Sequence, residues 1–154
     1  MKINFQALIS IYLHEMDRFR RTLTQSLLSP VLTTSLYFIV FGSVIGGYVE
    51  KIDGISYGSY IVPGLLMLTL LTQSISNTSF GIFFPKFNGT IYEILAAPIS
   101  TFEIVLAFVG AGATKTLVVS IVIFITSLFF VDVEVKYPFL MIFLLILVAV
   151  TLSL

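Results

Sequence analysis

Residues 84–100 read FPKFNGTIYEILAAPIS, a stretch with polar residues between two long apolar regions. Gly89 permits a turn, and Thr90 followed three residues later by Glu93 has the spacing of a capping box. In such a box each side chain satisfies a backbone amide that the first helical turn leaves without a partner. The pattern therefore predicts a short helix from about Ile91 to Ala97.

Pro98 is expected to end this helix after roughly two turns, because proline cannot donate the next backbone hydrogen bond. Ser100 and Glu103 repeat the capping spacing and predict the start of a second, longer helix. The short helix has an apolar face of three residues at helical spacing, Ile91, Ile94 and Leu95. A helix of this length is not stable alone, so it needs a surface to dock on.

The composition indicates an integral membrane protein. The chain is 58% hydrophobic and 10% charged, with a mean hydropathy of +1.09, whereas soluble domains are roughly 25% charged. The net charge of zero gives no electrostatic argument for nucleic acid binding. Cysteine is absent, and His14 is the single histidine, so a zinc site is not expected.

Residues 1–25 are predicted to form an amphipathic helix in the membrane interface. One face carries Phe5, Leu8, Ile9, Tyr12, Met16, Phe19 and Leu23, and a second, narrower apolar strip carries Ile3, Ala7 and Ile11. Arg18, Arg20 and Arg21 would then reach lipid phosphates. The alternative is a soluble helix packed on another domain.

Residues 27–154 are predicted to form one transmembrane domain, with spans at about 27–48, 57–80, 104–131 and 138–154. Pro30 is expected in the first turns of the first span, and Pro63-Gly64 predicts a kink near the entry of the second. The third span belongs to a helix from near Thr101 to Phe130. At about 45 Å it exceeds a bilayer core of about 30 Å, so it must tilt or protrude.

Polar residues cover one face of the second span: Thr69, Thr72, Gln73, Ser76 and Asn77. In hydrocarbon these groups need partners, so the face is expected to meet protein or a wet path. Hydrogen bonding between helices and contact with a substrate both remain open.

The third predicted helix contains Gly110, Gly112 and Ala113, which would let another helix approach closely. Lys115 is expected near the inner membrane boundary, with its side chain extended to lipid headgroups. Residues 110–115 read GAGATK but do not form a phosphate loop, because Thr114 occupies the position of the required glycine and no strand precedes the segment.

The basic residues predict a cytoplasmic N-terminus, since Lys2, Arg18, Arg20, Arg21 and Lys86 then lie inside and Lys51 and Lys136 outside. Together with the basic end of the first helix and with Pro63-Gly64, the loop pattern Gly-Thr-x-x-Glu-x-Leu-x-x-Pro resembles the permease subunit of ABC type 2 exporters. The likeness covers essentially the whole chain. It is closest to the bacterial inner-membrane branch at residues 86–98.

The resemblance implies that Ile91 to Ala97 is the coupling helix that sits on an ATP-binding cassette subunit. The residues involved would be Gly89, Thr90, Ile91, Glu93, Ile94, Leu95 and Pro98. Residues 1–25 would contain the connecting helix, and Glu93 would brace this junction against Arg18, Arg20 or Arg21. ATP and magnesium would bind to the partner subunit and not to this chain. Ala97 departs from the Ser or Thr that many members have.

The resemblance also implies six spans and a homodimer of permeases, so we interpret this chain as the N-terminal part of a protein of the bacterial cytoplasmic membrane. Substrate would pass between the first and second spans of two copies, along Thr69, Gln73 and Asn77. Lipid-linked glycans, drugs and lipids all fit, as in polysaccharide or multidrug export. A non-transporting scaffold or assembly protein is the alternative, and an intramembrane enzyme lacks a catalytic pair.

Overall fold

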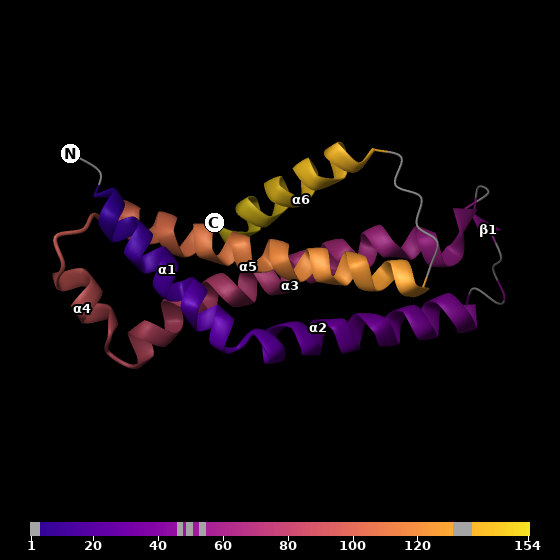
Figure 1. Ribbon diagram of the computed structural model, residues 1–154, viewed down its shortest axis with the longest axis horizontal. Coiled ribbons are helices and arrows are strands. Elements are labelled where there is room, and N and C mark those ends of the chain that lie inside the picture. Colours follow the sequence, from indigo (N-terminus) through magenta and orange to yellow (C-terminus); the bar gives the residue numbers. More distant parts are fainter. Residues whose placement is uncertain (1–3, 46–47, 49–50, 53–54, 131–136) are drawn as a thin grey trace.

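The computed structural model describes residues 4–45, 48, 51, 52, 55–130 and 137–154. Its elements follow the chain from the N-terminus to the C-terminus (Figure 1). The helices are α1 (Phe5–Arg21), α2 (Leu23–Tyr37), the π-helix η1 (Phe38–Ile45), α3 (Tyr57–Phe87), α4 (Ile91–Ala96), α5 (Thr101–Phe130) and α6 (Pro138–Ser153). Between η1 and α3 lies an antiparallel pair of two-residue strands, β1 (Lys51–Ile52) and β2 (Ile55–Ser56), with Lys51 opposite Ser56.

Three helical stretches are long and apolar enough to cross a membrane: Leu23–Phe41, Tyr57–Phe87 and Thr101–Phe130. They correspond to the first three predicted spans. The fourth predicted span contains the shorter apolar helix Phe139–Ser153. The segments between these predicted spans at 49–56 and 132–137 lie partly outside the described residues.

The boundary between the first two helices differs from the predicted one. α1 ends at Arg21, and the Thr22 amide donates to the carbonyls of Arg18 and Phe19. α2 then begins at Leu23, which was expected to belong to the interfacial helix. Pro30 is consequently inside α2, where it is buried, and not in the first turns of the span.

The second long helix continues beyond the predicted end of its span near residue 80. α3 runs to Phe87 and contains both Pro63 and Pro85. Pro85 lies in the last turn and lacks the amide that would donate to the Gly81 carbonyl, and the helix ends two residues later at Phe87. The first four residues of the 84–100 stretch are therefore helical, and the turn begins only at Asn88.

α5 is the central element, and α1, α2, α3 and α6 all pack against it. Two groups of buried apolar residues form the core. One contains Phe38, Val62, Leu65, Leu66, Val119 and Ile123, and the other contains Leu70, Ala113, Leu145 and Ala149. Many large apolar side chains on α2, α3, α5 and α6 are exposed. Such a surface is what a bilayer would cover.

Gly112 confirms the predicted close approach of a second helix to α5. A Cβ atom at this position would overlap the Thr78 hydroxyl of α3. At Gly110, by contrast, a Cβ would make only an ordinary contact with the Tyr12 ring at 3.9 Å. The α3–α5 contact therefore requires a glycine at position 112, and a Cβ at Gly81 of α3 would also be tight, at 3.3 Å from the Phe108 ring of α5.

Substitution of Gly112 by valine is expected to destabilise the protein by about 1–3 kcal/mol, because the added methyl groups overpack the α3–α5 contact. The matched control is Gly64→Val, since no atom lies within 4 Å of a Cβ at Gly64. Thermal unfolding of the full-length protein in detergent measures both effects. Equal losses in the two variants would contradict a specific contact at Gly112.

Candidate functional site

Residues 84–100 form the predicted turn and short helix. Gly89 has a φ of 77°, the left-handed region that glycine adopts without strain. α4 follows at Ile91–Ala96, and Ala97 is extended before Pro98, with φ −71° and ψ 150°. The turn, the helix and its end are therefore confirmed, with the helix ending one residue early.

The capping box predicted at the start of this helix is wrong. The Thr90 side chain makes no capping hydrogen bond, and the Glu93 amide donates instead to the Thr90 carbonyl at 3.1 Å. Thr90 has helical dihedral angles, φ −63° and ψ −19°. A capping side chain needs an extended backbone at this residue, so the hydroxyl cannot reach the amides of the first turn.

α4 buries none of its residues. Leu95 is 58% exposed and Tyr92 is 74% exposed, while Ile91 and Ile94 are half-buried. Six residues form too short a helix to persist without tertiary contacts. The apolar face of α4 therefore offers a docking surface at one end of the bundle (Figure 1).

The second predicted capping box, at the start of α5, is confirmed. Glu103 Oε2 accepts from the Ser100 amide at 2.8 Å, and Ser100 Oγ accepts from the Phe102 amide at 3.2 Å. The other oxygen of Glu103 accepts from the Asn4 amide at 2.6 Å. Glu103 is buried, and it ties the start of α1 to the start of α5.

Glu15 is a buried charged residue that the sequence analysis did not identify. It is 3% exposed, and its two oxygens accept from Lys115 Nζ at 2.6 Å and from Arg18 Nη1 at 3.1 Å. Lys115 is 4% exposed. The predicted extension of Lys115 to lipid headgroups is therefore wrong, because Glu15 supplies the opposite charge inside the protein.

Arg18 also differs from its predicted role. Its guanidinium lies over the Phe84 ring at 5.9 Å, in addition to its ion pair with Glu15. The predicted brace from Glu93 is not formed within the described residues, where Arg18 pairs with Glu15 and Glu93 is exposed on α4. Arg20 and Arg21 are exposed.

α1 packs along α5 by means of these polar contacts and one more. The Tyr12 hydroxyl donates to Thr114 Oγ1 at 3.1 Å, between the contacts of Asn4 and Glu15. The apolar residues predicted to share one face of α1 are divided, because Tyr12 faces α5 while Phe5 and Ile9 are exposed. The exposed apolar strip of α1 consists of Phe5, Ile9 and Leu13.

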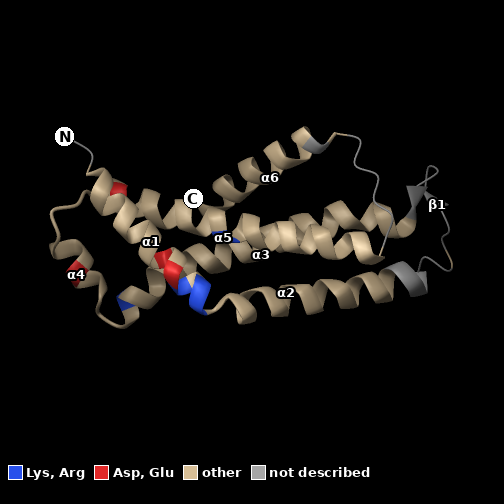
Figure 2. Cartoon of the chain, viewed as in Figure 1, with Lys and Arg blue, Asp and Glu red and all other residues tan. Residues whose placement is uncertain are grey.

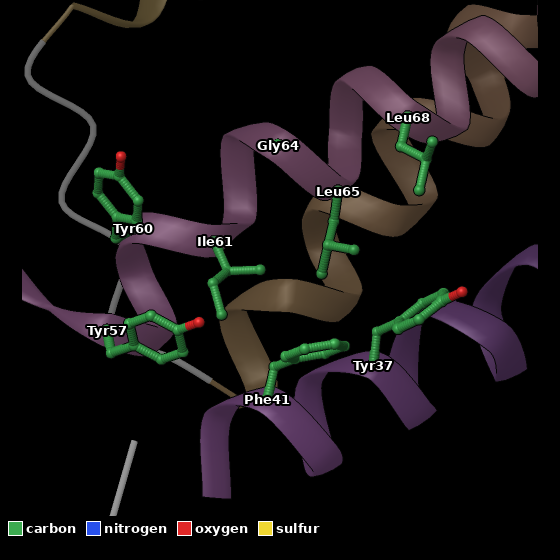
Figure 3. A pocket seen from close by; sticks show the side chains of 8 residues that line it. All are labelled: Tyr37, Phe41, Tyr57, Tyr60, Ile61, Gly64, Leu65 and Leu68. Carbon is green, nitrogen blue, oxygen red and sulfur yellow. The ribbon is translucent and has the colours of Figure 1, made fainter. Parts of the chain in front are cut away.

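Three pockets are lined by residues of both α2 and α3, and the third is lined by residues of α1 and α5 as well. The aromatic pocket, of about 530 Å³, is lined by Tyr37, Phe41, Tyr57, Tyr60, Ile61, Gly64, Leu65 and Leu68. Figure 3 shows the rings of Tyr37 and Phe41 between the two helices, facing Ile61 and Leu65. The threonine pocket, of about 250 Å³, shares Tyr37, Leu65 and Leu68 with it and adds Ser29, Pro30, Thr33, Thr34, Thr69, Thr72 and Gln73.

The third pocket, here the basic pocket, has a volume of about 700 Å³ and shares Ser29 with the threonine pocket. Its polar lining comprises Arg18, Thr22, Gln25, Ser26, Ser29, Ser76, Asn77 and Lys115, and its apolar lining comprises Phe19, Phe80 and Phe84. The three residues predicted to line a path, Thr69, Gln73 and Asn77, thus all face this series of pockets.

The polar face of α3 was predicted either to form hydrogen bonds between helices or to contact a substrate, and its hydrogen bonds bear on this choice. Thr69 and Thr72 donate to carbonyls of their own helix, at Leu65 and Leu68. Ser74, which was not on the predicted face, instead links α3 to α6, because its hydroxyl donates to the Ala149 carbonyl and pairs with the Ser153 hydroxyl. Asn77 Nδ2 is buried and has no partner within the described part of the chain.

Comparison with known proteins agrees with these features. The family described as ABC-2 type transporter matches residues 6–154. The inner membrane transport permease YadH of Escherichia coli strain K12 is 41% identical over 135 residues, which cover 88% of this chain and 53% of YadH. The Shigella flexneri permease of that name matches to the same extent.

The chain therefore spans about half the length of the curated relatives that it matches. No solved structure gives a significant match. The family description and the inner-membrane relatives agree with the membrane setting that the apolar helices indicate. With its family match over almost all of its length and its apolar spanning helices, the chain belongs to the ABC-2 type transporter family.

Proposed function

We propose that this chain is the permease part of an ABC exporter and that α4 couples it to a separate ATP-binding subunit. The observation that carries the proposal is the exposed apolar face of α4, a helix too short to be stable without a partner surface. ATP and magnesium would bind on the partner, whose hydrolysis cycle would supply the energy.

α4 has a direct route to the membrane helices. Residues 97–100 join it to α5, and Glu103 fixes both the start of α5 and the start of α1. Movement of the partner subunit would displace α4 and, through this short connection, α5. Packed helices switch between discrete arrangements, which allows a small displacement to move whole elements.

The charged residues support an inner-membrane orientation with a cytoplasmic N-terminus. Figure 2 shows the coloured charges gathered at the end of the bundle where α1 and α4 lie. Arg18, Arg20, Arg21 and Lys86 belong to this group. Basic residues are retained on the cytoplasmic side, which is also where an ATP-binding subunit would meet α4.

The substrate would move along the pockets between α2 and α3, with Thr69, Gln73 and Asn77 as polar lining. These pockets open on the surface of a single chain. A second copy of the permease would close them, so the working unit would be a homodimer. Uncharged hydroxyl and amide groups next to aromatic rings would suit an amphiphilic or aromatic substrate.

The proposal is tested by a pull-down of the tagged full-length protein from native membranes, followed by measurement of vanadate-sensitive ATP hydrolysis in the eluate. The wild-type protein is expected to retain an ATP-binding subunit. Glu93→Ala is expected to reduce retention, because Glu93 is the exposed charge of α4. If wild type retains no ATPase, the protein acts as a non-transporting scaffold and the proposal fails.

A further inference from the structure

The basic pocket has an excess of positive charge. Arg18 and Lys115 line it, and Glu15, which binds both, is the carboxylate beside them. No acidic side chain lines the pocket among the described residues. Two cations share one carboxylate, so the local charge is positive, with Lys115 buried and the Arg18 side chain 37% exposed.

The two cations also have unused hydrogen-bond donors. A guanidinium carries five N–H groups and an ammonium three. In the described structure Arg18 donates one hydrogen bond to Glu15, and Lys115 donates one to the other oxygen of the same carboxylate. The remaining donors can reach an acceptor that enters the pocket.

Asn77 provides a second, independent observation. Its Nδ2 group is buried, lines the basic pocket and has no acceptor within the described residues. A buried donor without an acceptor is unfavourable, so such a group commonly marks a place for water or a ligand. Ser29 and Ser76 add hydroxyl donors on the two sides of the pocket.

Three aromatic rings form the apolar part of the lining. Phe19, Phe80 and Phe84 line the basic pocket beside its donors. Through Ser29 the basic pocket adjoins the threonine pocket, which in turn shares Tyr37 with the aromatic pocket. A cationic, donor-rich end therefore continues into an increasingly apolar groove.

We propose that the basic pocket binds the anionic headgroup, a phosphate or a carboxylate, of an amphiphilic molecule whose apolar part lies along the groove. Arg18 and Lys115 would hold the charge, Asn77 would donate to it, and the phenylalanine walls would exclude water. The inference deepens the proposed function, since it identifies the chemical class of the transported molecule and the place where it enters.

The test is binding of dioctanoyl phosphatidic acid to the full-length protein in an uncharged detergent, measured by native mass spectrometry. The wild-type protein is expected to bind this lipid at least roughly tenfold more tightly than dioctanoylglycerol, which lacks the phosphate. Arg18→Gln is expected to weaken binding roughly tenfold, and Asn77→Leu roughly fivefold. Arg21→Gln is the control, because Arg21 is exposed on the same helix and does not line the pocket.

Two results would overturn the proposal. Equal binding by wild type, Arg18→Gln and Asn77→Leu would show that the lipid binds elsewhere. Displacement of the lipid by an equal concentration of inorganic phosphate would show that the apolar groove makes no contribution, and the ligand would not be an amphiphile. Lipid binding does not require the ATP-binding subunit, so a failed pull-down with intact lipid binding would refute the proposed function while leaving the pocket assigned.

Discussion

Replacement of Glu15 by glutamine is expected to lower the free energy of unfolding by about 3–5 kcal/mol. The change leaves Lys115 as an uncompensated cation in a site where it is 4% exposed. The amide of glutamine cannot neutralise that charge, and the other partner of residue 15, Arg18, is itself a cation. Titration of the full-length protein with sodium dodecyl sulfate, followed by circular dichroism, measures the loss.

Two further variants separate the ion pair from a general effect on α1. The double substitution Glu15→Gln with Lys115→Met removes both charges and is expected to recover most of the stability, because buried pairs replaced by neutral groups of similar size are often neutral. Arg18→Gln is expected to cost less than about 1 kcal/mol, since the Arg18 side chain is 37% exposed. If the double variant is as unstable as Glu15→Gln, the loss of stability does not come from an unpaired Lys115.

The substitution Leu95→Asp is expected to abolish retention of the ATP-binding subunit in the pull-down. Leu95 is the most exposed aliphatic residue of the apolar face of α4, and docking would bury it. A carboxylate at the centre of a buried interface has to be desolvated without a partner, which typically costs at least 2 kcal/mol, or roughly thirtyfold in affinity.

Asn88→Asp is the matched control for this prediction. It adds the same charge to the same loop, but Asn88 is exposed in the turn before Gly89 and outside α4. It is expected to leave both retention and ATP hydrolysis near wild-type values. Loss of retention in Asn88→Asp as well would indicate that any negative charge in the loop is harmful, and the role of the apolar face would be unsupported.

Local sequence rules predicted those parts of the structure that local chemistry controls. Gly89, Pro98 and the Ser100–Glu103 pair each act within a few residues, and the turn, the end of α4 and the start of α5 were therefore predictable. The Thr90 cap failed although its residue types were right. Its backbone is already helical, and sequence spacing does not reveal that difference.

Contacts between distant segments were not predictable in the same way. Lys115 has its partner 100 positions earlier in the chain, and no periodicity connects the two residues. One signal existed, however, because Glu15 continues the narrow strip of Ile3, Ala7 and Ile11 at intervals of four residues. A carboxylate in line with apolar residues on one helical face indicates a buried charge that needs a partner.

The three contacts between α1 and α5 fix the two helices in one parallel register. Asn4 is hydrogen-bonded to Glu103, Tyr12 to Thr114 and Glu15 to Lys115. From the first contact to the last the helices rise about 17 and 18 Å, at 1.5 Å per residue. Sliding of one helix by even one residue would stretch all three contacts together. α1 and α5 can therefore tilt or rotate within the membrane only together, as one rigid unit.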